Sequence, residues 1–330
     1  MEQRRLGASG LRVSRLALGT MTWGHDTDPE EAGASLLAFL DAGGTLVDTA
    51  DVYGGGEAER ILGGLFAEVI PRAEVVVATA AGARRVDGPF GGGASRSSLL
   101  AALDTSLERM GTDYVDLWQL HGWDVEVPIE ESLAAVDVAM ATGRARYAGL
   151  VDFGGWQLAT AARHQMRGGP ALPMVSTQTE YSLLERGPER DVIPAATAHG
   201  LGLLPWAPLG RGVLTGKYRD GTPADSRGAS EHLAGYVGRH RDERAARIVQ
   251  AVVTAAHGLG TSPLAVALAW VRDRPGVVAP VVGARDGAQL LGSLAAEELT
   301  LPPAIRGALD DVSAPPAEPE EGFEETTPWG

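Results

Sequence analysis

The sequence predicts an α/β protein that folds as a closed (β/α)8 TIM barrel. Eight short, almost continuously apolar segments alternate with eight amphipathic ones over about 300 residues, the usual size of such a barrel. Continuously apolar strands indicate a parallel sheet that is covered by helices. A doubly wound open sheet is the alternative, but no G-x-G-x-x-G motif follows the first strand.

Each element has its own sequence signal. Residues 4–6 and 11–13 flank Gly7-Ala8-Ser9-Gly10 and predict an N-terminal β-hairpin. Asp28-Pro29 is a helix start signal, and Gly43-Gly44 ends the same helix. The barrel strands are expected at residues 15–18, 45–47, 75–79, 115–120, 145–150, 175–179, 201–204 and 277–281. The helices are expected at residues 30–41, 58–68, 97–110, 129–142, 157–167, 191–199, 263–273 and 287–296.

Two regions depart from this repeat, and the rest reads as one barrel domain over residues 1–330. Residues 210–260 form an insertion after the seventh strand, with a Gly/Pro/Ser-rich loop followed by a helix at 242–257. Loops of this length are uncommon unless they are functional. Residues 314–330 are acidic and rich in proline, so we expect them to be disordered or strapped over the barrel mouth.

Composition restricts the possible functions. The chain has 28 Lys and Arg against 43 Asp and Glu, and its net charge of −15 argues against binding to nucleic acid or to an anionic membrane. It has no cysteine, which excludes disulfides, cysteine-ligated zinc and thiol catalysis. Its seven histidines form no H-E-x-x-H motif or close pair, so no metal site is expected. With no signal-peptide core and no membrane-spanning apolar run, we expect a cytoplasmic protein.

Polar and aromatic residues gather where the predicted strands end. Asp48 ends one strand, and Tyr53 follows five residues later in a Gly-rich loop, a plausible acid/base pair. In a (β/α)8 barrel the residues just after the strands face the active site. Those positions are Gly19-Thr20, Asp48 with Tyr53, Thr79-Ala80, His121, Val151-Asp152, Gln178, Trp206 and Arg285.

The chain resembles the aldo-keto reductase family nearly end to end. The motifs that carry the resemblance are Leu18-Gly19-Thr20-Met21, Val47-Asp48-Thr49-Ala50-Asp51-Val52-Tyr53-Gly54, Ser95-Arg96, and the runs at residues 111–121, 178–184, 205–218 and 280–285. The resemblance implies hydride transfer between NADPH and a carbonyl compound. It also implies that Tyr53 is the general acid, that His121 polarises the carbonyl, and that Asp48 supports Tyr53.

The same resemblance implies a set of cofactor contacts. Gln178 would hold the nicotinamide carboxamide, and Trp206 would stack on the ring. Leu209, Gly210, Gly212, Lys217 and Arg227 would surround the pyrophosphate, while Arg285 and Gln289 would take the 2′-phosphate. A guanidinium suits this last role because it offers a planar fork of donors.

The departures from the family pattern fall at functional positions. The family's catalytic lysine is replaced by Ala80, and its Ser-Asn pair by Val151-Asp152. Gly292 and Ser293 stand where Glu and Asn often contact adenine. Losing the lysine should raise the pKa of Asp48 and deprive Tyr53 of a favourable field. We therefore expect weakened NADP(H) binding, with Asp152 keeping part of the carboxamide contact. Arg84 and Arg85 are candidate substitute cations.

Three functions fit this pattern. The first is NADPH-dependent reduction of an aldehyde or ketone by an impaired or atypical site. The second is a redox-neutral reaction on the same scaffold, as in a dehydratase, isomerase or cyclase. The third is a non-catalytic NADP(H)-binding regulatory protein. Trp23, Tyr53, Trp123 and Trp206 are expected near the mouth, which favours an apolar or ring-bearing small-molecule substrate.

Overall fold

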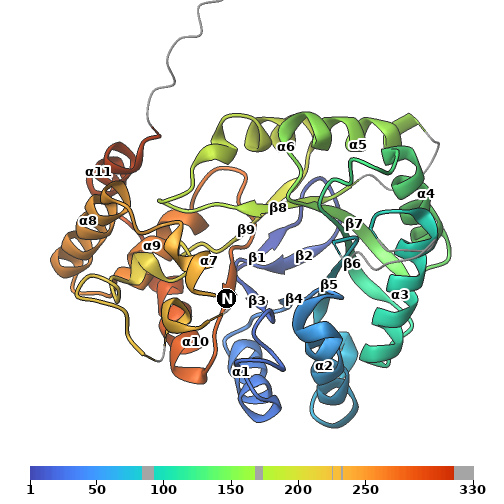
Figure 1. The fold of residues 1–330 in the computed structure, drawn as a ribbon, viewed down its shortest axis with the longest axis horizontal. Helices are drawn as coiled ribbons and strands as arrows, with labels where there is room; N and C mark the ends of the chain where they lie inside the picture. Colours follow the sequence, from blue (N-terminus) through green and yellow to red (C-terminus); the bar gives the residue numbers. More distant parts are fainter. Residues whose placement is uncertain (84–92, 168–173, 225, 232, 316–330) are drawn as a thin grey trace, which may run out of the picture.

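Eight parallel strands form the barrel in the computed structural model, which confirms the expected fold (Figure 1). The structure describes residues 1–83, 93–167, 174–224, 226–231 and 233–315. The strands are β3 (Ala17–Gly19), β4 (Leu46–Asp48), β5 (Val76–Ala81), β6 (Val115–His121), β7 (Ala145–Val151), β8 (Ser176–Glu180), β9 (Gly202–Trp206) and β10 (Val281–Gly283). They pair in chain order, and β10 returns to pair with β3.

The barrel closes between β9 and β10 with little regular pairing. Val277 forms a single parallel bridge with Leu203, and the Val278 amide donates to the Leu203 carbonyl. The strand expected at residues 277–281 is therefore misplaced, because the regular ladder with β3 runs from Val281 to Gly283. Pro280 explains the shift, since it has no N–H to donate and contributes only its carbonyl, which accepts from Ala17.

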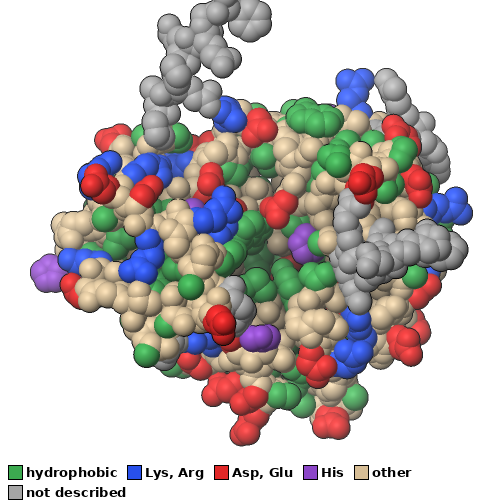
Figure 2. All heavy atoms as spheres, in the orientation of Figure 1, with side chains coloured by type: hydrophobic (Ala, Val, Ile, Leu, Met, Phe, Trp, Pro, Cys, Tyr) green, Lys and Arg blue, Asp and Glu red, His purple; other side chains and the backbone are tan. Residues whose placement is uncertain are grey.

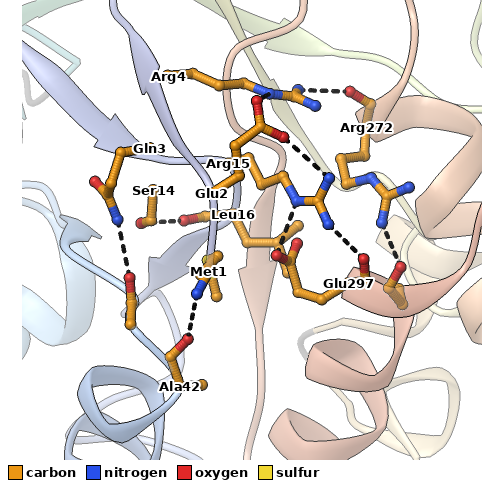
Figure 3. Close-up of polar contacts among 12 residues, drawn as sticks. Met1, Glu2, Gln3, Arg4, Ser14, Arg15, Leu16, Ala42, Arg272 and Glu297 are labelled. Carbon is orange, nitrogen blue, oxygen red and sulfur yellow. Dashed lines mark hydrogen bonds and ion pairs between the residues drawn. The ribbon is translucent and has the colours of Figure 1, made fainter.

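The predicted hairpin, β1 (Gln3–Arg5) with β2 (Arg12–Ser14), is confirmed and closes the N-terminal end of the barrel. Leu6 and Val13 are fully buried in the cluster that fills the barrel interior. Figure 3 shows how the hairpin is fastened: the Arg4 guanidinium donates to the Arg272 carbonyl at 2.9 Å, and Arg15 pairs with Glu297 at 2.8 Å. This end is packed and bonded, which leaves the opposite end for a site.

The eight expected barrel helices all form, with ends within two residues of those predicted. They are α1 (Pro29–Asp41), α2 (Glu57–Glu68), α3 (Arg96–Met110), α4 (Ile129–Ala141), α5 (Gly155–Arg167), α6 (Val192–His199), α9 (Pro263–Arg272) and α10 (Gly287–Leu294). The Asp28 side chain caps α1 by accepting from the Glu31 amide, as its start signal predicted. In Figure 1 these helices surround the strands.

The insertion forms a second packed unit beside β9. It contains α7 (Ala234–Gly238) and α8 (Glu243–Leu259), and α8 confirms the helix expected at 242–257. A further helix that the sequence analysis did not anticipate, α11 (Pro303–Ser313), packs against α8 and buries Leu309. Trp270 Nε1 donates to Asp310 at 2.9 Å and ties α9 to α11. Most of the acidic tail lies outside the described residues.

Among the described residues, no helix is by itself long and apolar enough to cross a membrane. Helices α8 and α9 satisfy the length and composition criteria only when joined, and a bend of 102° separates them.

Candidate active site

A cavity of about 670 Å³ opens where the barrel strands end. Figure 2 shows hydrophobic side chains around a central hollow on this face. The cavity brings together most of the predicted site residues: Asp48, Tyr53, His121, Asp152, Gln178, Trp206, Leu209, Gly212, Lys217, Arg227, Arg285 and Gln289. Residues from both ends of the sequence therefore share one chamber.

Asp48 ends β4 and is only 4% exposed. Its Oδ1 accepts hydrogen bonds from the side-chain amides of Gln178, at 2.8 Å, and Gln119, at 3.4 Å. Burial outweighs these two neutral donors and raises the pKa of Asp48 to about 7, in the direction that the sequence analysis predicted. Gln119 was not among the predicted site residues, although its place two residues before His121 in β6 gives it the same inward direction.

Tyr53 follows β4 in a short 3₁₀ turn, Tyr53–Gly56. Its ring packs against a buried apolar cluster of Ala50, Ala80 and Val151. Two of the changed positions, Ala80 and Val151, are thus neighbours and form one apolar wall. Burial and the nearby Asp48 carboxylate raise the pKa of the Tyr53 phenol well above its ordinary value. No cation in the described part of the chain lowers it, while Arg84 and Arg85 lie outside that part.

His121 ends β6 and lines the same cavity. Burial lowers the pKa of its imidazole, so the ring is neutral at pH 7. Its Nδ1 is buried and finds no hydrogen-bond partner among the described residues. A neutral imidazole can donate one hydrogen bond, which is what polarising a substrate carbonyl requires.

Asp152 fixes the orientation of Trp206. The indole Nε1 donates to Asp152 Oδ1 at 2.8 Å, which joins the ends of β7 and β9 across the cavity wall. Asp152 has a φ of 55°, a left-handed conformation that Asp and Asn adopt more readily than most residues. Burial raises the pKa of this carboxyl, and the indole hydrogen bond partly offsets that rise.

A buried ionic network, not anticipated from the sequence, supports this wall. Arg211 is 4% exposed and forms two hydrogen bonds with Glu180, at 2.8 and 2.5 Å. His240 Nε2 lies 2.9 Å from the same carboxylate, and the Arg211 guanidinium lies 3.7 Å from the centre of the Tyr236 ring. The network fastens α7 and the residues after it to β8. Arg211 lies in the predicted cofactor loop but carried no distinguishing signal there.

Besides Arg211, three cations line the cavity at the insertion and after β10: Lys217, Arg227 and Arg285, here called the cationic group. Among the described residues, no carboxylate forms an ion pair with any of them. Burial lowers the pKa of Arg227, and the neighbouring Arg285 charge adds to that effect. Two guanidiniums held close together suit an anionic ligand. Gln289 lies beside them, with its side chain bonded to Asp286.

Three of the residues predicted to contact cofactor or substrate do not line the cavity. Trp23 is fully buried in the main hydrophobic cluster, so the prediction that it forms a pocket wall is wrong. Its loop turns back under the barrel mouth, where the Trp23 amide donates to Thr20. Trp123 packs on Phe153 and Trp156, outside the cavity lining. Gly210, in the predicted cofactor loop, packs so closely on Leu184 that a Cβ at this position would lie 2.6 Å from that side chain.

No group of three or more His, Cys, Asp or Glu side chains that could hold a metal ion exists among the residues that the structure describes.

Comparison with known proteins agrees with this arrangement. The model of the Aldo/keto reductase family matches residues 15–314. The uncharacterized oxidoreductase YrpG of Bacillus subtilis is 35% identical, covering 94% of this chain and 96% of that protein. The L-glyceraldehyde 3-phosphate reductase of Escherichia coli K12 is 33% identical over 88% and 86% of the two chains. A probable voltage-gated potassium channel subunit beta of Oryza sativa is 36% identical over 90% and 91%. The chain belongs to the aldo/keto reductase family.

Proposed function

We propose that this protein is an NADPH-dependent oxidoreductase that reduces an aldehyde or ketone with an atypical active site. The observation that carries the proposal is the composition of one cavity. Asp48, Tyr53 and His121 line the cavity at or just after the strand ends. The cationic group lines the same cavity and has no carboxylate partner among the described residues.

The residues present fit NADP(H). The cationic group supplies positive charge for the pyrophosphate and 2′-phosphate, and Arg285 is the guanidinium that the family resemblance assigns to the 2′-phosphate. Trp206, held by Asp152, offers a flat indole for the nicotinamide ring. The side-chain nitrogen of Gln178 donates to Asp48, so the side-chain oxygen of Gln178 is the atom that would accept from the nicotinamide carboxamide. Val151 offers no polar group, so we expect the nicotinamide to be held less firmly.

When bound, NADPH would supply the hydride. The chain's own residues would orient and polarise the substrate. His121 would donate a hydrogen bond to the carbonyl oxygen from its neutral ring. Tyr53 would donate the proton, although burial and Asp48 make the phenol a weak acid. Asp48 would influence Tyr53 through its own protonation, which its pKa of about 7 places close to neutral pH.

That same pKa supports a second candidate, a redox-neutral reaction. A carboxyl that titrates near neutrality can serve as acid or base, and Asp48 faces the cavity with Tyr53 and His121 beside it. A regulatory role without catalysis is supported only by the similarity to relatives such as the rice potassium channel subunit. The three polar groups in one cavity favour catalysis.

The proposal is tested by following NADPH oxidation with a panel of aldehydes and ketones, using the wild-type protein and Tyr53→Phe. We expect slow turnover by the wild-type protein and a loss of about 100-fold in Tyr53→Phe, because general acid catalysis contributes about 10²–10⁴ in rate. Consumption of the carbonyl compound without NADPH oxidation would favour the redox-neutral candidate instead.

A further inference from the structure

The strand ends present carboxylates to the cavity without a positive partner among the described residues. Oδ1 of Asp48 accepts from two neutral amides, and Oδ2 accepts from none of the described side chains. Among the side chains that the structure describes, the Asp152 carboxylate accepts only from the Trp206 indole. The Arg211 guanidinium acts on Asp152 from a distance, but its charge is already matched by Glu180.

This arrangement makes Tyr53 a poor proton donor. Besides burial, the groups that act on the phenol are Asp48, Tyr236 and Asp152, and all of them oppose its ionisation. Reduction of a carbonyl creates an alkoxide that needs a proton. Each unit of pKa mismatch costs about 1.4 kcal/mol, so a carbonyl substrate is penalised here. A substrate that needs no proton during hydride transfer would avoid the penalty.

We propose that the site takes a cationic C=N substrate, an iminium ion, and that Asp48 is its counter-ion. This inference rests on the proposed function, because it requires reduced nicotinamide cofactor as the hydride donor. An iminium nitrogen already carries its proton or alkyl group. Its positive charge would pair with the Asp48 carboxylate in a largely buried setting, where an unpaired charge is costly. The apolar wall of Ala50, Ala80 and Val151 suits the carbon skeleton of such a substrate.

The step balances without a general acid. The C–H bond that forms at the iminium carbon takes its electron pair from the reduced cofactor. The π pair of the C=N bond withdraws onto nitrogen as a lone pair, which leaves a neutral amine. The substrate is reduced and loses its positive charge, while the cofactor is oxidised and gains it. The positive charge thus stays at the end of the cavity that holds Asp48 and Asp152, and no proton moves.

The test compares two substrates of similar size. N-methyl-3,4-dihydroisoquinolinium is a permanently charged iminium, and 1-tetralone is a neutral ketone on a similar fused ring. NADPH oxidation is followed with each, after subtraction of the rate without enzyme. The dissociation constant of NADPH is measured on the same preparations by tryptophan fluorescence. The variants are Asp48→Asn and, as a matched control, Asp113→Asn, which changes an exposed carboxylate after α3.

We expect kcat/KM for the iminium to exceed that for the ketone by at least about tenfold. Asp48→Asn should lower the iminium value by about tenfold or more, as expected for the loss of a charged partner, and leave NADPH affinity nearly unchanged. Asp113→Asn should change neither. If NADPH binds, any one of three results would overturn this inference and leave the proposed function standing. These are faster reduction of the ketone than of the iminium, no enzymatic reduction of the iminium, and no effect of Asp48→Asn on iminium reduction. Absence of NADPH binding at millimolar concentration would overturn the proposed function with it.

Discussion

The amide nitrogen of Gln178, in the middle of β8, donates a 2.8 Å hydrogen bond to Oδ1 of Asp48, at the end of β4. The family resemblance implies that Gln178 holds the nicotinamide carboxamide, and the structure adds this second partner. The carboxylate of Asp48 is thus held by an amide and carries no balancing charge from any described residue. Because the partner of Asp48 is a neutral amide, burial is free to raise the pKa of this carboxyl.

Ala80→Lys should restore carbonyl reduction. Position 80 adjoins Tyr53 in the apolar cluster, and a nearby ammonium shifts a pKa by ~1–3 units. We expect at least about tenfold faster NADPH-dependent reduction of 1-tetralone. Ala80→Met is the matched control, since it adds a chain of similar length without charge. Equal rates in the two variants would show that the missing cation is not what limits carbonyl reduction.

Asp48→Asn should change how stability depends on pH. Because the pKa of Asp48 is raised from 3.8 to about 7 in the fold, the folded protein holds a proton that the unfolded chain has lost between those values. The contribution of Asp48 therefore lowers the free energy of unfolding as pH rises from about 4 to about 7, and it does not change further above pH 7. In urea unfolding, the free energy of unfolding of Asp48→Asn relative to that of wild type should increase by about 2–3 kcal/mol between pH 5 and pH 8. A constant difference would contradict the raised pKa.

Asp152 should tolerate asparagine better than alanine. Asparagine keeps an acceptor for Trp206 Nε1 and suits the φ of 55°. Alanine loses the hydrogen bond, worth about 1 kcal/mol, and strains the backbone by about 1 kcal/mol more. We expect urea unfolding to show Asp152→Ala destabilised by about 2 kcal/mol, with NADPH binding about tenfold weaker. Asp152→Ala behaving like wild type would mean that Trp206 does not depend on this contact.

Glu180→Gln should loosen the insertion. Arg211 is buried and relies on Glu180 for its counter-charge, so removing that charge should cost about 3 kcal/mol in the free energy of unfolding. Glu57→Gln is the control, because its pair with Arg60 spans 3.7 Å on the surface and is worth less than about 1 kcal/mol. Equal effects of the two changes would show that the buried network does not fasten the insertion.

The barrel could be predicted because its strands and helices alternate in plain apolar patterns with clear caps such as Asp28. The position of β10 could not, because Pro280 interrupts a run whose apolar pattern continues. Helix α11 was not predicted, because it is stabilised by packing on α8, and the sequence of residues 303–313 alone does not show that contact. Tertiary context decides both cases.

The site was predictable to the extent that its residues end strands. Asp48, His121 and Trp206 reach the cavity for that reason, and Gln178 reaches it from two residues before the end of β8. Trp23 also follows a strand, but its loop folds back and buries the indole, and no spacing rule distinguishes the two outcomes. The Glu180–Arg211–His240 network joins residues up to 60 positions apart, so it becomes visible only in three dimensions.

A fluorescence titration of the protein with NADPH and with NADH tests most directly whether the cavity holds NADP(H). We expect saturable NADPH binding that Arg285→Gln weakens by about tenfold or more, since a charged hydrogen bond is worth about 1.5–3 kcal/mol. NADH affinity should change little in that variant, and Arg60→Gln, on the exposed face of α2, should alter neither. No NADPH binding at millimolar concentration would show that the cavity does not hold NADP(H), and equal loss of NADPH and NADH affinity in Arg285→Gln would show that Arg285 does not bind the 2′-phosphate.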